Sequence, residues 1–120
     1  MTLSLRKELA PLGIAAMVVE PGSFRTDFAG RSLTQSAEPI ADYADTAGKR
    51  RIEAGTGDGQ QPGDPAKAAE LLVDAVESPE PPYMLLLGDD ASDAFRAALD
   101  ALRADADAWE QRSRSTGYTD

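Results

Sequence analysis

The chain has 120 residues, the size of a single domain, and its hydrophobic share of 42% includes few aromatics, so any core must consist largely of small side chains. Its 21 acidic and 12 basic residues give a formal net charge of −9, which argues against nucleic acid or anionic membrane surfaces as partners. It has no cysteine and no histidine, which excludes a disulfide framework, histidine-based zinc sites and catalytic triads that use histidine.

Targeting signals do not stand out in the sequence. No apolar run approaches the roughly 20 residues of a membrane-spanning helix. The first ten residues, MTLSLRKELA, lack the basic, apolar and small-residue regions of a signal peptide. We therefore expect a cytoplasmic protein.

The first element is a short amphipathic helix. Leucines recur at helical spacing at its start: Leu3, Leu5, Leu9 and Leu12. We expect the helix to end near Pro11, with Gly13 as its stop. A helix of about ten residues is marginal without tertiary support, so it must pack on another element.

A buried strand is predicted next, at residues 14–19, where the run IAAMVV is apolar without alternation. Such a pattern favours a strand covered on both faces in a parallel sheet. Pro21 has no N–H for the ladder, and Gly22 allows positive φ and close approach of another group, so the strand should end there. Because ligands of open α/β sheets bind beyond the carboxyl ends of strands, residues 21–28 are the leading candidate for a site.

Residues 23–64 form an irregular, polar region that we interpret as a lid and linker. A weak apolar face predicts a helix at residues 40–52 within it. Residues 55–65 are rich in Gly, Pro and Asp, and we expect a mobile connection there. The alternative, a phosphate-binding loop, is disfavoured because the glycine spacing fits neither the dinucleotide nor the P-loop motif. Long loops in compact domains are often lids.

A second helix and strand follow. Asp64 as N-cap and Pro65 in the first turn predict a helix that ends at Pro79. Residues 83–87 then predict a strand, and the order strand, helix, strand makes it parallel to residues 14–19. Two strands alone do not make a stable sheet in water, so further partners are required.

Four polar residues follow Gly88: Asp89, Asp90, Ser92 and Asp93. A magnesium site is one interpretation, but N-cap and first-turn acids that complement a helix dipole are favoured. The long final helix carries apolar residues near one face, among them Phe95, Leu102 and Trp109. We expect residues 113–120 to be a frayed tail. Residues 1–120 are thus interpreted as a single, partial α/β domain.

Three local sequences point to a known family: ELAPLGI at residues 8–14, EPGSFRTDF at residues 20–28, and LLLGDDA at residues 85–91. Together they resemble the late part of the short-chain dehydrogenase/reductase family. The resemblance implies the C-terminal portion of a Rossmann-like, doubly wound parallel sheet, ordered as helix, strand, lid region, helix, strand and C-terminal helix. It also implies that residues 23–64 close over a substrate.

In that family the Pro-Gly loop lies beside the nicotinamide of NAD or NADP, and a Thr four residues after the Gly helps to hold the cofactor. The resemblance implies four cofactor-binding residues in this chain: Pro21, Gly22, Phe24 through its backbone, and Thr26. Considered without the resemblance, Thr26 is instead the cap of a turn.

The roles of the two phenylalanines and the arginine in this loop are left open by the sequence. Phe28, which we assign to substrate binding, and Phe24 either wall a substrate pocket or pack under the lid. Arg25 either meets a phosphate or carboxylate in a bidentate pair or lies in solvent.

The family's catalytic motifs have no counterpart in this sequence. Tyr43 is followed four residues later by Ala47 and Tyr83 by Leu87, and Tyr118 has only two residues after it, so no Tyr-x-x-x-Lys exists. The Gly-rich turn and the catalytic Ser are absent too, and we assign no catalytic residue. The resemblance implies that Met1 aligns just downstream of the catalytic lysine and that the chain is the truncated C-terminal part of a larger oxidoreductase. We expect weak or no cofactor binding by this chain alone.

Two further hypotheses belong to other classes. In the first, the chain is a non-catalytic binding or assembly module whose strand at residues 14–19 pairs with another chain. The partner is then the missing N-terminal half, a separate protein, or a second copy in a homo-oligomer. In the second, the chain is an independent small α/β domain that shares only ancestry with the family.

Overall fold

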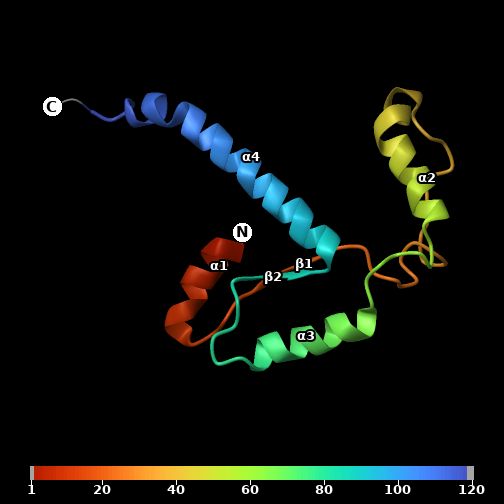
Figure 1. Ribbon diagram of the computed structural model, residues 1–120, viewed down its shortest axis with the longest axis horizontal. Helices are drawn as coiled ribbons and strands as arrows, with labels where there is room; N and C mark the ends of the chain where they lie inside the picture. Colours follow the sequence, from red (N-terminus) through yellow and green to blue (C-terminus); the bar gives the residue numbers. More distant parts are fainter. Residues whose placement is uncertain (1, 119–120) are drawn as a thin grey trace.

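The computed structural model describes residues 2–118. Short parallel strands lie at the centre, between helices (Figure 1). The elements in chain order are α1 (Thr2–Leu9), a 3₁₀ turn (Ala10–Leu12), β1 (Val18–Pro21), a 3₁₀ turn (Ala41–Tyr43), a π-helical turn (Ala44–Gly48), α2 (Lys49–Thr56), α3 (Pro65–Glu77), β2 (Met84–Leu87) and α4 (Asp89–Arg114). The α/β class and the small parallel sheet are therefore confirmed.

The first helix ends as predicted. The 3₁₀ turn after α1 carries Pro11, and Gly13 terminates it with φ +71°, in the left-handed region that favours glycine. The N–H of Gly13 donates to the carbonyl of Ala10 at 3.0 Å. This turn reverses the chain toward the first strand.

The first strand is shorter and later than predicted: it spans Val18–Pro21 rather than residues 14–19. Its register with β2 runs from Val18 opposite Met84 to Pro21 opposite Leu87, so the four residues of β2 limit the pairing. Ile14 is held in the turn after α1 instead, where its N–H donates to the carbonyl of Leu9 at 3.3 Å. Apolar character alone did not show where the pairing begins.

The predicted burial of this strand on both faces was wrong. Val18 and Val19 are half-buried, while Glu20 and Pro21 are exposed. Val18 and Gly22 use their N–H groups on β2, at 2.9 and 2.8 Å. Because alternate residues of a parallel strand bond to one neighbour, Pro21 lies between these bonds and its missing N–H removes none of them.

The second helix–strand unit forms as predicted. The carboxylate of Asp64 accepts the N–H of Ala66 at 2.9 Å, and Pro65 occupies the first turn of α3. The helix ends at Glu77, and Ser78 is already extended before Pro79, since a residue before proline avoids the α region. α3 lies along the sheet on the side opposite to α4 (Figure 1).

The predicted helix at residues 40–52 is instead a series of three helical types that continues to Thr56. Its expected apolar face has no cover, because Ile40 and Ile52 are 64% and 68% exposed. Arg51 ties this segment to the preceding loop, donating to the hydroxyl of Ser36 at 2.7 Å and to its carbonyl at 2.8 Å.

The core is as thin as the composition indicated. Among the described residues, only Ala75 and Leu87 are buried apolar residues. The accessible surface is 10031 Å², whereas a compact monomer of this mass has about 6,200 Å². The radius of gyration is 19.9 Å, against about 14 Å for a compact domain of this length. Much of α2 and α4 projects away from the sheet (Figure 1).

Candidate functional site

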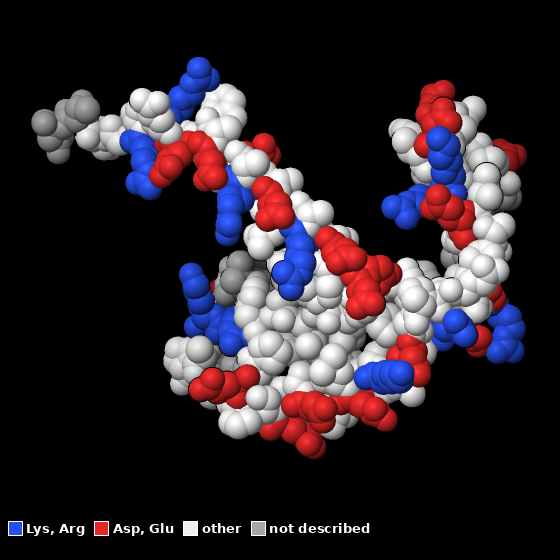
Figure 2. Space-filling model, in the orientation of Figure 1, with Lys and Arg blue, Asp and Glu red and all other residues white. Residues whose placement is uncertain are grey.

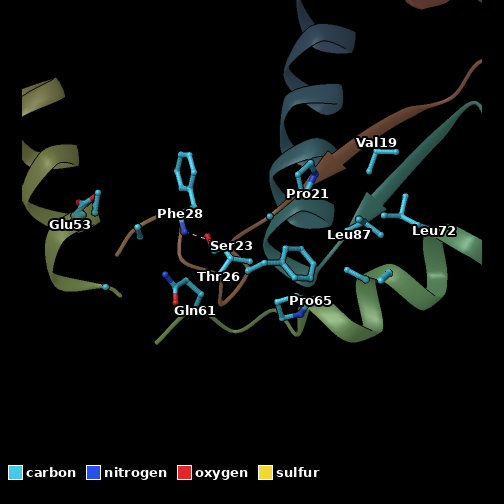
Figure 3. Close-up of a pocket in the computed structure, with 17 residues that line it drawn as sticks. Val19, Pro21, Ser23, Thr26, Phe28, Glu53, Gln61, Pro65, Leu72 and Leu87 are labelled. Carbon is cyan, nitrogen blue, oxygen red and sulfur yellow. Dashed lines mark hydrogen bonds between the residues drawn. The ribbon is translucent and has the colours of Figure 1, made fainter. Parts of the chain in front are cut away.

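A cavity of about 800 Å³ lies at the carboxyl ends of the two strands. The loop after β1 forms one side, α3 another, and the end of α2 faces them (Figure 3). Most of its lining is apolar, and among the described residues that line it Glu53 alone is charged. The position agrees with the sequence-based expectation for ligand sites in open α/β sheets.

The structure brings all five predicted site residues to this cavity: Pro21, Gly22, Phe24, Thr26 and Phe28. Phe28 is 77% exposed, and its ring stands away from the sheet, toward the side of Glu53 (Figure 3). Phe24 is half-buried. The two phenylalanines therefore line one cavity but do not pack together in a closed core.

Only one of the two expected reasons for a glycine applies at Gly22. Positive φ angles occur at Gly13, Gly59 and Gly88, but not at Gly22. A Cβ atom at Gly22 would collide with the carboxylate of Asp90, so the residue is small because a side chain approaches it closely. The close approach was predicted, but the approaching group belongs to the chain itself.

Asp90 joins the loop after β1 to the start of α4. Its Oδ2 accepts the backbone N–H of Ser23 at 2.6 Å, and its Oδ1 accepts the N–H of Ala91 at 3.0 Å. The bond from the Ser23 backbone is the main reason that the pKa of Asp90 is lowered, because bonds to a carboxylate favour its ionised form. α4 is capped by Gly88 without a side-chain bond.

The acids after Gly88 therefore do not act as N-caps, although Asp89 and Asp90 do lie in the first turn as predicted. Within residues 2–118 there is no group of three or more potential ligands arranged to hold a metal ion. The structure gives the magnesium interpretation no support.

Residues 55–65, which were predicted to be a mobile connection, are hydrogen-bonded to the loop after β1 near their C-terminal end. Gly63 forms a parallel bridge with Phe24: its N–H donates to the carbonyl of Ser23, and its own carbonyl accepts the N–H of Arg25, both at 3.0 Å. A Cβ at Gly63 would lie 2.6 Å from the ring of Phe24. The Phe24 ring thus packs flat against a backbone that has no side chain at that point.

Arg25 is exposed, in line with one of the two alternatives from the sequence, but its guanidinium also has a partner within the chain. Its Nε and Nη2 both donate to the backbone carbonyl of Gln61, at 3.2 and 3.0 Å. The guanidinium therefore fastens the loop after β1 to the segment before α3. This second contact, beside the Phe24–Gly63 bridge, holds two sides of the cavity together.

Thr26 caps a turn, as its residue type alone indicated. Its Oγ1 accepts the N–H of Phe28 at 3.3 Å. A hydroxyl that accepts one bond still has a proton to donate. The turn is therefore compatible with a second bond from Thr26 to a ligand carbonyl.

Comparison with known proteins finds two similar proteins, each matched over part of its length. Oxidoreductase BOA17 from Botryotinia fuckeliana (strain B05.10) is 33% identical over 109 residues, which make up 91% of this chain and 39% of that protein. A crystal structure of a short-chain dehydrogenase from Streptomyces avermitilis is 40% identical and superimposes with a TM-score of 0.78, covering 97% of this chain and 42% of that one. The chain is therefore similar to part of a short-chain dehydrogenase/reductase.

No protein-family model matches the chain. The chain spans about two fifths of each relative, 39% and 42% of their lengths. The resemblance inferred from residues 20–28 and 85–91 is nevertheless confirmed, and the helices around a small parallel sheet match a Rossmann-like fragment of a short-chain dehydrogenase/reductase. None of the helices in the described part of the chain is long and apolar enough to cross a bilayer.

Sequence reasoning missed several residues at this cavity. Asp90 holds the Pro-Gly loop, and Glu53, Gln61, Leu72 and Leu87 line the cavity. The Oε1 atom of Gln61 is enclosed and has no hydrogen-bond partner. One signal was available for Asp90: adjacent parallel strands end at the same edge, so the residues after β2 must lie beside the residues after β1.

Proposed function

We propose that the chain supplies the nicotinamide side of an NAD(P)-dependent oxidoreductase: the Pro-Gly loop and the lid over a substrate. Pro21, Gly22, the Phe24 backbone and Thr26 would contact the cofactor, and Phe28 the substrate. The observation that carries the proposal is that these five residues meet at one cavity beyond the carboxyl ends of parallel strands. The cofactor supplies the hydride chemistry, and the protein orients it.

The lining suits one end of a dinucleotide. An apolar wall with a hydroxyl donor at Thr26 matches a planar nicotinamide ring that carries a carboxamide. The described lining has no Lys or Arg and no Gly-rich helix N-terminus for a pyrophosphate. We therefore expect millimolar affinity from these 120 residues, about −4 kcal/mol, and no turnover without a Tyr-x-x-x-Lys pair.

The lid role concerns residues 23–64. Glu53 and Ala54 of α2 reach the cavity from the side opposite to α3 (Figure 3). Phe28 stands between them and the sheet, with most of its ring exposed. A substrate that covers this ring would lie under the segment that we propose as the lid.

NADH and NADPH titrations followed by the backbone amide signals test the cofactor role. Phe24 and Thr26 should shift with a millimolar dissociation constant. Thr26→Ser, which keeps the hydroxyl, should bind like the parent chain, whereas Thr26→Val should bind several-fold more weakly. Thr34→Val is the matched control, because Thr34 does not line the cavity. Micromolar affinity, or no shifts up to tens of millimolar, would contradict the proposal.

A second candidate function, a non-catalytic assembly module, is favoured by the open sheet. Within the described residues β1 pairs with β2 alone, so each strand leaves one edge for another chain. The partner would be the remaining part of a short-chain dehydrogenase fold, a separate protein or a second copy. Sedimentation velocity at several concentrations should show a concentration-dependent oligomer if copies pair, and a constant monomer would reject self-pairing.

A further inference from the structure

The carboxylate of Asp90 occupies a space that the chain keeps free of side chains. A Cβ at Gly22 would collide with this carboxylate, and a Cβ at Gly88 would lie 2.8 Å from its Oδ1. The backbone N–H of Ser23 donates to Oδ2 at 2.6 Å. The carboxylate therefore lies against two glycines from two different loops; the positive φ of Gly88, +95°, favours glycine by itself, so Gly22 is the informative one.

Nothing in the local backbone of Gly22 demands glycine. Its φ is not positive, so an alanine can adopt the same conformation. Its N–H donates to the carbonyl of Leu87 at 2.8 Å, a bond that alanine also makes. The absent side chain therefore serves the space taken by Asp90.

We propose that Asp90 is a positioning residue that locks the Pro-Gly loop to the start of α4 and so fixes the rim of the cavity. The lock consists of the carboxylate, the N–H of Ser23 and the missing side chain of Gly22. It joins the ends of the two neighbouring strands, because Gly22 follows β1 and Asp90 lies in the first turn after β2.

The consequence for ligand binding rests on the proposed cofactor role. Pro21, Gly22 and Ser23 line the cavity. The Asp90 side chain does not line it, but it accepts the backbone N–H of Ser23. A loop held in place before binding loses less conformational entropy when a ligand arrives. Loss of the lock should therefore weaken dinucleotide binding although Asp90 itself is not among the lining residues.

The lock is tested first without a ligand, by NMR of the Ser23 amide. An N–H bonded to a carboxylate resonates downfield and exchanges slowly with solvent. In Asp90→Asn and Asp90→Ala the Ser23 proton should move upfield, and its exchange should accelerate about tenfold, the loss expected for a bond to a charged group. Asp89→Asn removes the same charge from the same turn and should leave both quantities unchanged.

A double-mutant cycle tests the steric part. Gly22→Ala should displace the carboxylate and reproduce the Ser23 signature of Asp90→Ala. Because both changes break one lock, the double variant Gly22→Ala/Asp90→Ala should show no further effect. Unchanged α3 amide signals serve as the check that each variant is folded.

The two proposals fail in different ways. An unchanged Ser23 amide in the Asp90 variants, an equal change in Asp89→Asn, or additive effects in the cycle would overturn the lock. If the Ser23 signature appears but NADH causes no shifts in the parent chain, the cofactor role fails and the lock stands. If NADH binds the parent chain and Asp90→Ala several-fold more weakly, both are supported.

Discussion

Sixty-seven positions separate Ser23 from Asp90, yet one hydrogen bond of 2.6 Å joins them. The bond ties the loop after β1, which has no regular structure of its own, to the first turn of α4. Bonds between a carboxylate and backbone N–H groups are among the stronger hydrogen bonds in proteins. The bond from the Ser23 backbone lowers the pKa of Asp90 from its ordinary value.

This lowered pKa predicts how the loop responds to acid. Its folded pKa lies below the ordinary Asp value of about 4, so Asp90 stabilises the closed loop above that value. The contribution is lost as the pH falls through the lowered pKa. The Ser23 amide shift should be constant above about pH 4 and move upfield only below it. In Asp90→Asn the Ser23 amide shift should be flat across that range, because the side chain no longer carries an ionisable group.

Arg25 provides a second prediction at the scale of single residues. Arg25→Ala removes two bonds to the Gln61 carbonyl and should lower the free energy of unfolding by about 1 kcal/mol. Arg31 is the comparison: its pair with Asp27, at 2.8 Å, is exposed on both sides, so Arg31→Ala should change the free energy by less than about 0.5 kcal/mol. Urea unfolding measures both free energies. Equal decreases in the two variants would show that the bonds from Arg25 to Gln61 stabilise the chain no more than an exposed ion pair does.

At the same scale, the sequence led to residues that line the cavity, but not to their contacts. Pro21, Gly22 and Thr26 were found because a loop after a strand and a family motif coincide there. The bond from Arg25 to a backbone carbonyl was not predictable, because backbone carbonyls carry no residue-specific signal. The role of Asp90 was not predicted, because acids in the first turn of a helix are common for another reason: they interact favourably with the helix dipole.

Elements were predictable where the signal is local. Asp64 and Pro65 fixed the start of α3, and Gly13 fixed the end of the first helical segment. The bounds of β1 were not predictable, because they depend on how many residues β2 offers as partners. The 3₁₀ and π turns before α2 were missed for a related reason: a weak apolar face indicates a helix but not its hydrogen-bond register.

The cap of α3 can be tested directly. Asp64→Ala removes the acceptor of the Ala66 N–H and should destabilise the chain by about 1 kcal/mol. Asp74→Ala, an exposed change within the same helix, should be neutral or slightly stabilising because alanine favours helices. Circular dichroism during thermal unfolding reports both. A loss of stability in Asp74→Ala equal to that in Asp64→Ala would contradict the cap.

At the scale of the whole molecule, the main feature is the number of large apolar side chains that are exposed to solvent. Phe28, Leu102 and Trp109 are 77%, 67% and 58% exposed. Acidic side chains gather along α3 and at the start of α4, while uncharged side chains occupy the middle of the face in Figure 2, over the sheet. The chain spans about two fifths of its relatives, 39% and 42%. We propose that another protein surface covers these apolar side chains.

This exposure predicts an unusual heat capacity of unfolding. A compact domain of this length has a heat-capacity change of about 1.4 to 1.8 kcal/mol/K, because unfolding exposes its apolar core. With only Ala75 and Leu87 as buried apolar residues in the described chain, the monomer should show a clearly smaller change. Calorimetry at a concentration where sedimentation shows a monomer measures it. A full-sized change in a proven monomer would mean that α2 and α4 fold back onto the sheet in solution; a full-sized change that appears only with association would mean that a second copy covers the exposed surface.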